Sequence, residues 1–486
     1  MSHTFTRALV ATVLVSGTTL GSGCGVPPTN AERSRAQGWI VTQAPVGRRS
    51  MPSVDQLPAD PNALYPNGTR IVWVDASSPA ATHRRVLSGD LVAAGAPSLT
   101  LAGDAVLFTG KASDASAWSI YRSPLDSPAP RIVLNAEGDC RSAREMAHHR
   151  LVAACRTHES APAWSLYTAA MDGSDPQRIT FGPGSAIAPF PLRDGRILFS
   201  LEQRPGTGRP VAAFALFTLN PDGTMLEPFS GSHRSPAIKH RARQADDDGV
   251  FFLASGGSSG ATASRVEMRA PHVEPTPAWS TSAGVELSVP TAIEPLAGGD
   301  LLVAATGTSS TAAVYRITAE GEVALAFDDP EWDELEAIST RPPAAPRGRP
   351  SGRQPGRDTA TLIGYDAARG DGEVGPAHGS IRPSHVAIDA LRSPGSDEVD
   401  RAVMIDRARV HHDGSFIVEV PTDLPIRVRS LDAEGSELYR SDWFWMRPGE
   451  VRACFGCHED RASAPLNRVV NALADSPAGS PEVRSR

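Results

Sequence analysis

The sequence is poor in cysteine, has no excess of basic charge and contains no long apolar run. Five cysteines in 486 residues are too few for a disulfide framework, so their placement matters more than their number. The net charge of -8 argues against a nucleic-acid binder that relies on a basic surface. No apolar run approaches the roughly 18 residues that a transmembrane helix needs, so we expect no membrane span.

The composition fits a folded protein built largely from β-structure. Hydrophobic residues make up 40% and charged residues 21%, which permits a sizeable core and argues against disorder of the whole chain. The chain holds 43 glycines and 42 prolines, a turn-rich composition that is typical of many-stranded all-β proteins. At roughly 150 residues per domain, the length predicts two to four domains.

The N-terminus has the features of an export signal. Residues 1–24 contain Arg7, the apolar stretch Ala8–Val15 and small residues before Cys24. Such an apolar stretch is too short to span a membrane and suits a signal peptide. The sequence around Cys24 resembles a bacterial lipoprotein cleavage site, which implies lipidation of Cys24, a membrane anchor, and a location in the periplasm or cell envelope. An ordinary secretory signal with an incidental cysteine is the alternative. We expect residues 25–60 to be a tether.

Residues 61–340 contain an internal repeat. A strand-like apolar run recurs about every 45 to 55 residues and is followed by an alternating run, a polar turn and a short closing strand. The apolar runs are residues 71–74, 106–108, 151–153, 197–199, 250–252 and 301–303. About four strands per unit, repeated in this way, predict a β-propeller of about six blades.

The repeat also resembles a known propeller type. Trp164–Tyr167, Asp172–Ser174 and Arg178–Thr180 follow the pattern aromatic-Ser-aliphatic-Tyr, Asp-Gly-Ser and Arg-Ile-Thr. This order is similar to the TolB-type propeller repeat. The aromatic residues are those that blade packing requires, so they indicate no function by themselves.

Two features of the third unit leave alternatives open. Cys140 and Cys155 would form a disulfide outside the cytoplasm, or one would be a buried thiol and the other an unrelated loop thiol. His148 and His149 are adjacent, and in a strand they would point to opposite faces. A solvated or loop position is therefore favoured for them over a metal site.

Residues 341–358 form a Pro-, Gly- and Arg-rich stretch that we interpret as an inter-domain linker. Its arginines offer contacts to an acidic partner, but a solvated hinge is the default expectation. Residues 359–470 return to a β-pattern and predict a smaller, sandwich-like β-domain. Residues 471–486 are expected to be a disordered tail.

Cys454-Phe-Gly-Cys457-His458 is the strongest chemical motif in the chain, because it is the c-type haem attachment sequence. Two thiols at this spacing add to the two vinyl groups on one edge of a porphyrin, and the next residue, His458, falls beneath the iron as its axial ligand. A structural zinc site would need a second ligand pair, and a thioredoxin-like pair would need a βαβ unit. Neither follows from the sequence, and a disulfide between these two cysteines would be strained.

The distal haem ligand is not specified by the sequence. Candidates in the same domain are His378, His385, His411, His412, Met404 and Met446. His385 and His411 are mildly favoured. A ligand from this set would make a saturated electron carrier, whereas an open position would permit chemistry on a small molecule. The aromatic cluster Trp443–Trp445 would either line the haem edge or serve ordinary core packing.

The C-terminal part resembles the hydrazine synthase alpha subunit. The resemblance rests on Arg447-Pro448-Gly449-Glu450 before the haem motif, on Asp413–Pro421 and on Leu431–Gly435. It implies a propeller followed by the haem-bearing middle domain of that family, over about residues 60 to 470. In the family, a tyrosine four residues after the motif histidine ligates the active haem and that histidine binds zinc, and a further domain holds a second haem. The matching position here is Ala462. The resemblance therefore implies one haem with His458 as its simplest axial ligand, and it does not imply hydrazine synthesis.

The sequence thus predicts an all-β protein with about six propeller blades and a smaller β-rich domain that carries one haem c. We expect an exported, lipid-anchored monohaem protein that transfers electrons to or from a partner protein, with the propeller as docking scaffold and no nucleic-acid partner. A haem enzyme acting on a small nitrogen or oxygen species is a second hypothesis. A TolB-like binding module with a vestigial motif is a third.

Overall fold

The computed structural model describes fourteen segments of the chain, which are residues 38–47, 60–76, 84–135, 138–157, 163–203, 213–230, 238–255, 262–271, 273–279, 287–307, 311–369, 382–391, 402–454 and 469–475. The chain divides into two compact units between Ala36 and Gln37. The whole first unit, with the export signal and Cys24, lies outside the described residues. In the described residues, no helix combines the length and apolar character that crossing a membrane requires.

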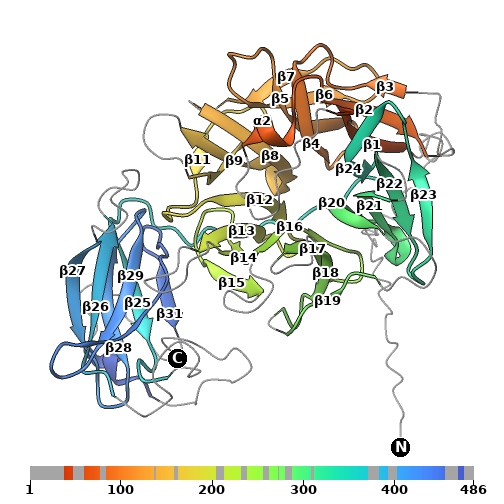
Figure 1. The fold of residues 1–486 in the computed structure, drawn as a ribbon. Helices are drawn as coiled ribbons and strands as arrows, with labels where there is room; N and C mark the ends of the chain where they lie inside the picture. The colour runs from red at the N-terminus through yellow and green to blue at the C-terminus, as the bar shows by residue number, and fades with distance from the viewer. Residues whose placement is uncertain are drawn as a thin grey trace, which may run out of the picture. The chain divides into compact units, whose positions relative to one another are not determined.

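Strands β1 to β24 form the larger part of the described structure (Figure 1). The first sheet has the order β24-β1-β2-β3 and consists of β1 (Gly38–Pro45), β2 (Arg70–Asp75), β3 (Arg84–Val86) and β24 (Trp332–Ser339). The second consists of β4 (Ala93–Leu99), β5 (Ala105–Lys111), β6 (Ser119–Pro124) and β7 (Arg131–Leu134). The third consists of β8 (Gly138–Met146), β9 (Arg150–Thr157), β10 (Ser165–Ala170) and β11 (Gln177–Arg178).

The following strands repeat the same antiparallel pattern. They are β12 (Ala186–Pro191), β13 (Ile197–Gln203), β14 (Ala213–Leu219) and β15 (Glu227–Ser230), then β16 (Ile238–Gln244), β17 (Gly249–Ser255), β18 (Thr262–Glu267) and β19 (Thr276–Pro277). One parallel pair, Phe214 with Ile238, joins these two sets. The last sheet is β20 (Ser288–Pro295), β21 (Leu301–Thr306), β22 (Ala312–Ile317) and β23 (Val323–Phe327). Short helices are α2 (Pro61–Leu64), η2 (Ala147–His149), η3 (Ala297–Gly299) and η4 (Asn471–Asp475).

The edge strands β4, β8, β12, β16, β20 and β24 contact one another in cyclic order, so the sheets follow each other around a ring (Figure 1). Strand β24 comes last in the ring but pairs with β1, which comes first, and this pairing joins the two ends of the repeat. The next strand of two sets, β5 and β17, is buried along its whole length because it packs against sheets on both sides. The arrangement is propeller-like, and the predicted all-β class is confirmed.

The strands that contact around the ring carry β-bulges. The register shifts within β4, β8, β12, β16 and β20, and each of these shifts contains or adjoins a non-glycine residue with positive φ. These residues are Ala96, Ser142, Ala188, Arg241 and Val289, with φ between 46° and 57°. A bulge bends a strand and re-aims its side chains. The repeated bulges therefore turn the side chains of these strands toward the axis of the ring.

The smaller domain consists of two sheets that share one core. The first has the order β28-β25-β31, with β25 (Thr359–Gly364), β28 (Phe416–Pro421) and β31 (Val451–Cys454). The second has the order β27-β26-β29-β30, with β26 (His385–Leu391), β27 (Ala402–Arg409), β29 (Ile426–Leu431) and β30 (Glu437–Arg440). Leu362 and Val418 of the first sheet pack in one cluster with Val386, Ile388 and Val428 of the second.

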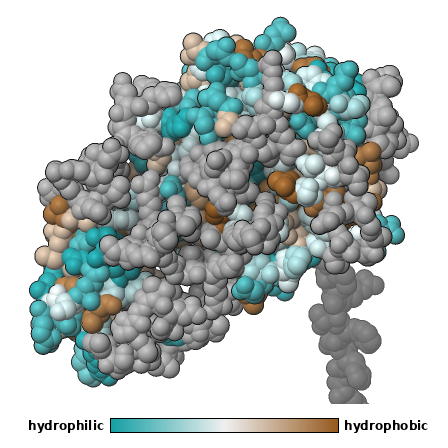
Figure 2. All heavy atoms as spheres, viewed as in Figure 1, coloured by the Kyte–Doolittle hydropathy of each residue, from teal (hydrophilic) through white to brown (hydrophobic). Residues whose placement is uncertain are grey.

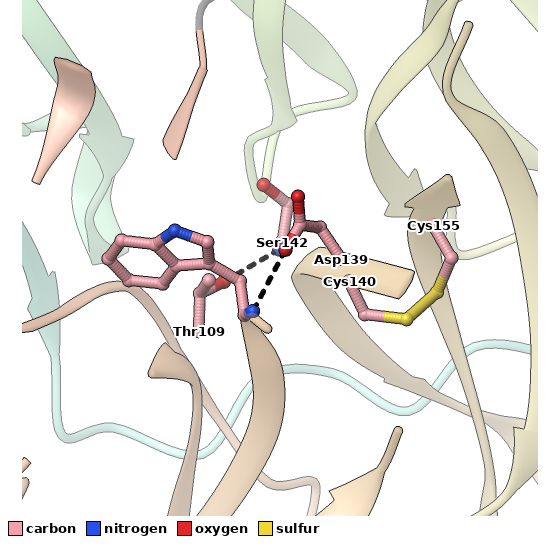
Figure 3. Close-up of a disulfide and its surroundings, with 6 residues drawn as sticks. Thr109, Asp139, Cys140, Ser142 and Cys155 are labelled. Atoms are coloured by element: carbon pink, nitrogen blue, oxygen red, sulfur yellow. Dashed lines mark hydrogen bonds between the residues drawn. A yellow bond between two sulfur atoms is a disulfide. The ribbon is translucent and has the colours of Figure 1, made fainter. Parts of the chain in front are cut away.

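Three details correct or settle the sequence analysis. Part of the expected tether, residues 38–45, is not a tether, because it forms β1 in the middle of a sheet. His148 and His149 lie in the turn η2 with φ of 61° and 53°, as a loop position requires, and not in a strand. Cys140 and Cys155 are directly opposite each other on β8 and β9 and form a disulfide (Figure 3).

The linker, residues 341–358, has no regular secondary structure and is largely exposed to solvent, but hydrogen bonds attach it to the ring sheets. The backbone N–H of Arg347 donates to the carbonyl of Arg193, and Arg349 Nε donates to Asn220 Oδ1 at 2.7 Å. The N–H of Gly352 donates to the carboxylate of Asp222 at 2.7 Å. The turn residues of the ring sheets offer acceptors that hold the linker along its length.

Candidate functional site

Cys454, the first residue of the haem motif, is the last residue of β31. Strand β31 runs parallel to β25, and Cys454 is paired with Gly364. Its carbonyl accepts a hydrogen bond from the N–H of Tyr365 at 2.8 Å, and its half-buried side chain packs against the domain core. The backbone of Cys454 is therefore fixed by the sheet. Cys457 and His458 lie outside the described residues.

The turn that contains His411 lies at the same end of this sheet as Cys454. His411 and Ser415 are joined by a backbone hydrogen bond just before β28, whose first residue, Phe416, pairs with Gly364. Gly364 pairs in turn with Cys454 on its other side. Two strand spacings, about 10 Å of sheet, therefore separate the start of β28 from the end of β31. The structure brings this candidate ligand toward the haem motif.

The chain returns to the same turn after the motif. The N–H of Asn471 donates to the carboxylate of Asp413 at 3.0 Å, and the N–H of Ala472 donates to the hydroxyl of Ser415 at 3.0 Å. Ala472 is fully buried. Residues 471–475 form η4, so the expected disordered tail does not begin at 471. Both flanks of the haem motif are thus attached to one end of the domain.

His385 belongs to the other sheet, where it begins β26 opposite Arg409 and Leu431. Its Nδ1 is 2.9 Å from the hydroxyl of Ser384. Desolvation lowers the pKa of His385, and the nearby Arg407 and Arg409 lower it further. The lower pKa favours the neutral imidazole, which is the form that binds iron.

The remaining distal candidates differ in their surroundings. Met446 is fully buried in the core of the smaller domain. Met404 on β27 is 54% exposed, and His412 is exposed in its turn. His378 lies outside the described residues.

The aromatic cluster serves packing between the two domains. Trp445 is fully buried in a cluster with residues of the ring sheets, including Ile179 and Leu219. Its indole Nε1 donates to the carbonyl of Gly223 at 3.4 Å. Phe444 packs against this cluster and against the core of the smaller domain. These contacts agree with the packing interpretation for Trp445.

The Arg-Pro-Gly-Glu segment that precedes the haem motif is a buried polar joint. Glu450 accepts hydrogen bonds from the backbone N–H groups of Met225 and Arg447 and from the guanidinium of Arg452. Arg447 is 2% exposed, lies 3.0 Å from Asp423 and rests over the ring of Phe181. In the sequence these residues stood out only as a family signature, and their role in joining the two domains was not predicted. The one available signal was the pair of charged residues, Arg447 and Glu450, next to the apolar run Trp443–Met446.

In the described part of the chain, no three His, Cys, Asp or Glu side chains are grouped so that they could hold a metal ion. The two domains define the class of the molecule. It is an all-β protein in which a propeller-like ring of sheets is followed by a smaller two-sheet domain whose last strand leads into a Cys-x-x-Cys-His sequence.

Comparison with known proteins confirms the predicted resemblance. Residues 362–459 match the family model of the hydrazine synthase alpha subunit middle domain. The structure of Kuenenia stuttgartiensis hydrazine synthase superposes with a TM-score of 0.75 at 18% identity, over 90% of this chain and 72% of that one. At this identity the likeness shows the fold. The chain is thus similar to hydrazine synthase in fold, and its smaller domain carries the alpha subunit's middle-domain sequence pattern.

Other propellers are more distant. TolB from Acinetobacter baumannii gives a TM-score of 0.42 at 9% identity, over 63% of this chain and 66% of that one. The β-propeller domain of the trilobed protease from Pyrococcus furiosus gives 0.34 at 12% identity, over 53% and 74%. TM-scores this low support no conclusion about the fold or function of this chain. No curated protein matches the sequence.

Proposed function

We propose that this protein is an exported monohaem c-type protein that transfers electrons, with a six-bladed propeller as the scaffold that docks its partner. The observation that carries the proposal is the position of the motif. Cys454 ends the β31 strand of a domain whose family match, residues 362–459, closes one residue after His458. The haem attachment sequence therefore stands inside the matched domain.

The donor set fits haem c. Cys454 is held by β25, and Cys457 follows three residues later, within about 11 Å even for a fully extended chain. The two thiols suit thioether bonds to one porphyrin edge, and His458 supplies a neutral nitrogen to the iron. Haem c, when bound, would accept and release one electron. The protein's part is to fix Cys454, which lies at the same end of the sheet as the turn of residues 411–415.

The disulfide supports export. Cys140 and Cys155 are both buried, with 0% and 1% exposure, and their bond joins neighbouring strands. Such bonds persist in oxidising compartments and are rare in the cytosol. Covalent haem attachment to the motif belongs to the same side of the membrane as the export signal. Lipidation of Cys24 would then tether the protein to the cell envelope.

A docking role suits the surface of the molecule. On the face seen in Figure 2, hydrophobic residues form small separate patches among hydrophilic ones. Weak, short-lived electron-transfer complexes use small and largely polar contact areas. Trp445 and the linker hold the haem domain and the ring together, so a partner bound to the ring would face a fixed haem domain.

The test uses the full chain produced with the cytochrome maturation machinery. The Cys454→Ala, Cys457→Ala double variant should be folded and colourless, while the wild type shows a c-type spectrum. The matched control is Cys140→Ala with Cys155→Ala, which removes as many cysteines and should retain haem. Retention of covalent haem by the first variant would contradict the proposal, and so would a colourless wild type.

A haem enzyme with an open iron position is the second candidate, and the position of His411 favours the electron carrier over it. Because His411 lies at the motif's end of the sheet, we expect it to be the distal ligand. The reduced wild type should not bind carbon monoxide, and the His411→Ala variant should bind it. His385→Ala serves as the control and should behave as the wild type. Carbon monoxide binding by the wild type would favour the enzyme.

A further inference from the structure

We propose that the axis of the propeller ring binds a small oxyanion, a carboxylate or a phosphate, between the guanidinium groups of Arg144 and Arg243. These residues come from β8 and β16, two strands that contact around the ring through β12. Each follows a bulge of its strand, and the bulges turn side chains toward the axis. This site is independent of the haem motif.

Both guanidinium groups lie against one aromatic ring. The Cζ of Arg144 is 5.7 Å, and that of Arg243 is 5.4 Å, from the centre of the Phe190 ring on β12. Two like charges on one apolar surface repel each other, and burial strengthens the repulsion. Arg243 is also near Glu294, with 3.3 Å between its Nε and the carboxylate. Glu294 also attracts Arg144, so the two guanidinium groups share this carboxylate.

The guanidinium N–H groups of Arg144 are available for a ligand. Within the described ranges, no side chain or carbonyl accepts a hydrogen bond from its guanidinium, and it remains partly exposed. The Nε of Arg243 is enclosed, and although the Glu294 carboxylate lies 3.3 Å away, the two atoms do not form a hydrogen bond. Buried donors are seldom left unsatisfied in folded proteins. An oxyanion placed between the two side chains would accept hydrogen bonds from both.

Glu336, which also faces Arg241 of β16, shows how a buried carboxylate is held by such arginines. Glu336 on β24 accepts from Arg241 at 2.6 Å, Tyr65 at 2.9 Å, the N–H of Ala96 at 2.7 Å and the hydroxyl of Thr42 at 3.0 Å. Both of its oxygens are thus satisfied by a guanidinium and further donors. In the described part of the chain, no second carboxylate contacts Arg144 or Arg243 in this way. The missing partner is an acceptor of the same chemistry.

The charged side chains around Arg144 and Arg243 carry more positive than negative charge. Arg144, Arg241 and Arg243 stand against Glu294 and Glu336 among the described residues. Arginine binds carboxylates and phosphates through two parallel N–H groups, which makes a pair of guanidiniums selective for oxyanions over halide ions. A monovalent or divalent oxyanion would balance the cluster.

Titration calorimetry on the full chain tests the site, with inorganic phosphate in one arm and acetate in the other at constant ionic strength. We expect one equivalent to bind in at least one arm. Arg144→Gln should weaken that binding about tenfold or more, as loss of hydrogen bonds to a charged group does. The exposed Arg131 on β7 is the matched control, and Arg131→Gln should bind as the wild type does.

Thermal unfolding separates binding from a purely structural role. Without the oxyanion, Arg144→Gln should melt at or above the wild-type temperature, because the change removes an uncompensated charge. The oxyanion should raise the melting temperature of the wild type and of Arg131→Gln, but not of Arg144→Gln. Arg243→Gln gives the same test if the first variant does not fold. Absence of binding in both arms, or equal binding by Arg144→Gln, would overturn the proposal.

Discussion

The indole Nε1 of Trp445 donates a hydrogen bond to the carbonyl of Gly223, which lies 222 positions earlier in the chain. This contact joins the haem-motif domain to the ring of sheets inside a continuous hydrophobic cluster. Gly223 has a φ of 85°, a conformation that glycine adopts without strain. The orientation of the domain that carries Cys454 therefore depends on a packed joint and not on the linker alone.

Replacing Trp445 by alanine should open this joint. Removal of a fully buried tryptophan typically costs about 3–5 kcal/mol. We expect a lower unfolding midpoint and faster proteolysis of the linker, residues 341–358. Trp443→Ala is the control, because Trp443 is only half-buried beside Arg427. Equal sensitivity of the two variants would show that Trp445 does not hold the domains together.

Glu450→Ala should be strongly destabilising. The carboxylate neutralises Arg452, from which it lies 2.7 Å, and the change would leave that buried guanidinium without its acceptor. Breaking a buried ion pair from one side costs about 3–5 kcal/mol. Glu419 on the exposed face of β28 is the matched control and should change stability by no more than about 0.5 kcal/mol. Urea unfolding of both variants measures the difference in stability. A Glu450→Ala variant as stable as Glu419→Ala would show that the Glu450–Arg452 pair does not stabilise the fold.

Glu334 should make stability depend on pH. Burial raises the pKa of Glu334 to about 9, and the charges of Asp328 and Asp329 contribute to the rise. The folded state therefore keeps a proton that the unfolded chain releases near 4.5, so the stabilisation is complete below that pH and is lost as pH rises toward 9.

Glu334→Gln removes this dependence while keeping an acceptor for Gln43. The variant should match the wild type at acidic pH and become progressively more stable than it up to pH 9, by at most about 1.4 kcal/mol per pH unit. Unfolding midpoints measured across this range test the sign. A difference that does not vary with pH would contradict a protonated Glu334.

Removing the disulfide should lower stability without abolishing the fold. Cys140 and Cys155 are 15 positions apart, and closing a loop of that size is worth about 3 kcal/mol in the chain-entropy model. The Cys140→Ala, Cys155→Ala variant should melt lower than the wild type and no longer respond to reductant. A wild type whose melting temperature is the same with and without reductant would show that the bond is absent or without effect.

The repeat in the sequence predicted most of the strands but not those nearest the axis of the ring. Apolar runs such as 250–252 and alternating runs such as 314–317 are the buried strands β17 and β22, because their periodicity follows directly from burial. The strands nearest the axis, such as β8 and β16, carry arginines and bulges that break the period-two pattern. Strand β1 was missed because its pairing with β24 spans the whole repeat, and no local signal announces such a partner.

The haem motif could be recognised from spacing alone, whereas its surroundings could not. That Cys454 would pair with Gly364, and that His411 would lie at the same end of the sheet, depends on the parallel pairing of two strands about 90 positions apart. An aromatic residue before the motif is expected whether it packs in a core or lines a haem. Only the structure shows that Trp445 packs against residues of the ring sheets.

The most direct test of the account is the intact mass and pyridine haemochrome spectrum of the full chain, purified from cells that carry out cytochrome c maturation. We predict a mass increase of one haem, a c-type spectrum, and haem on the peptide that contains Cys454 and Cys457. An unmodified mass, with both of these thiols open to alkylation, would contradict the central claim.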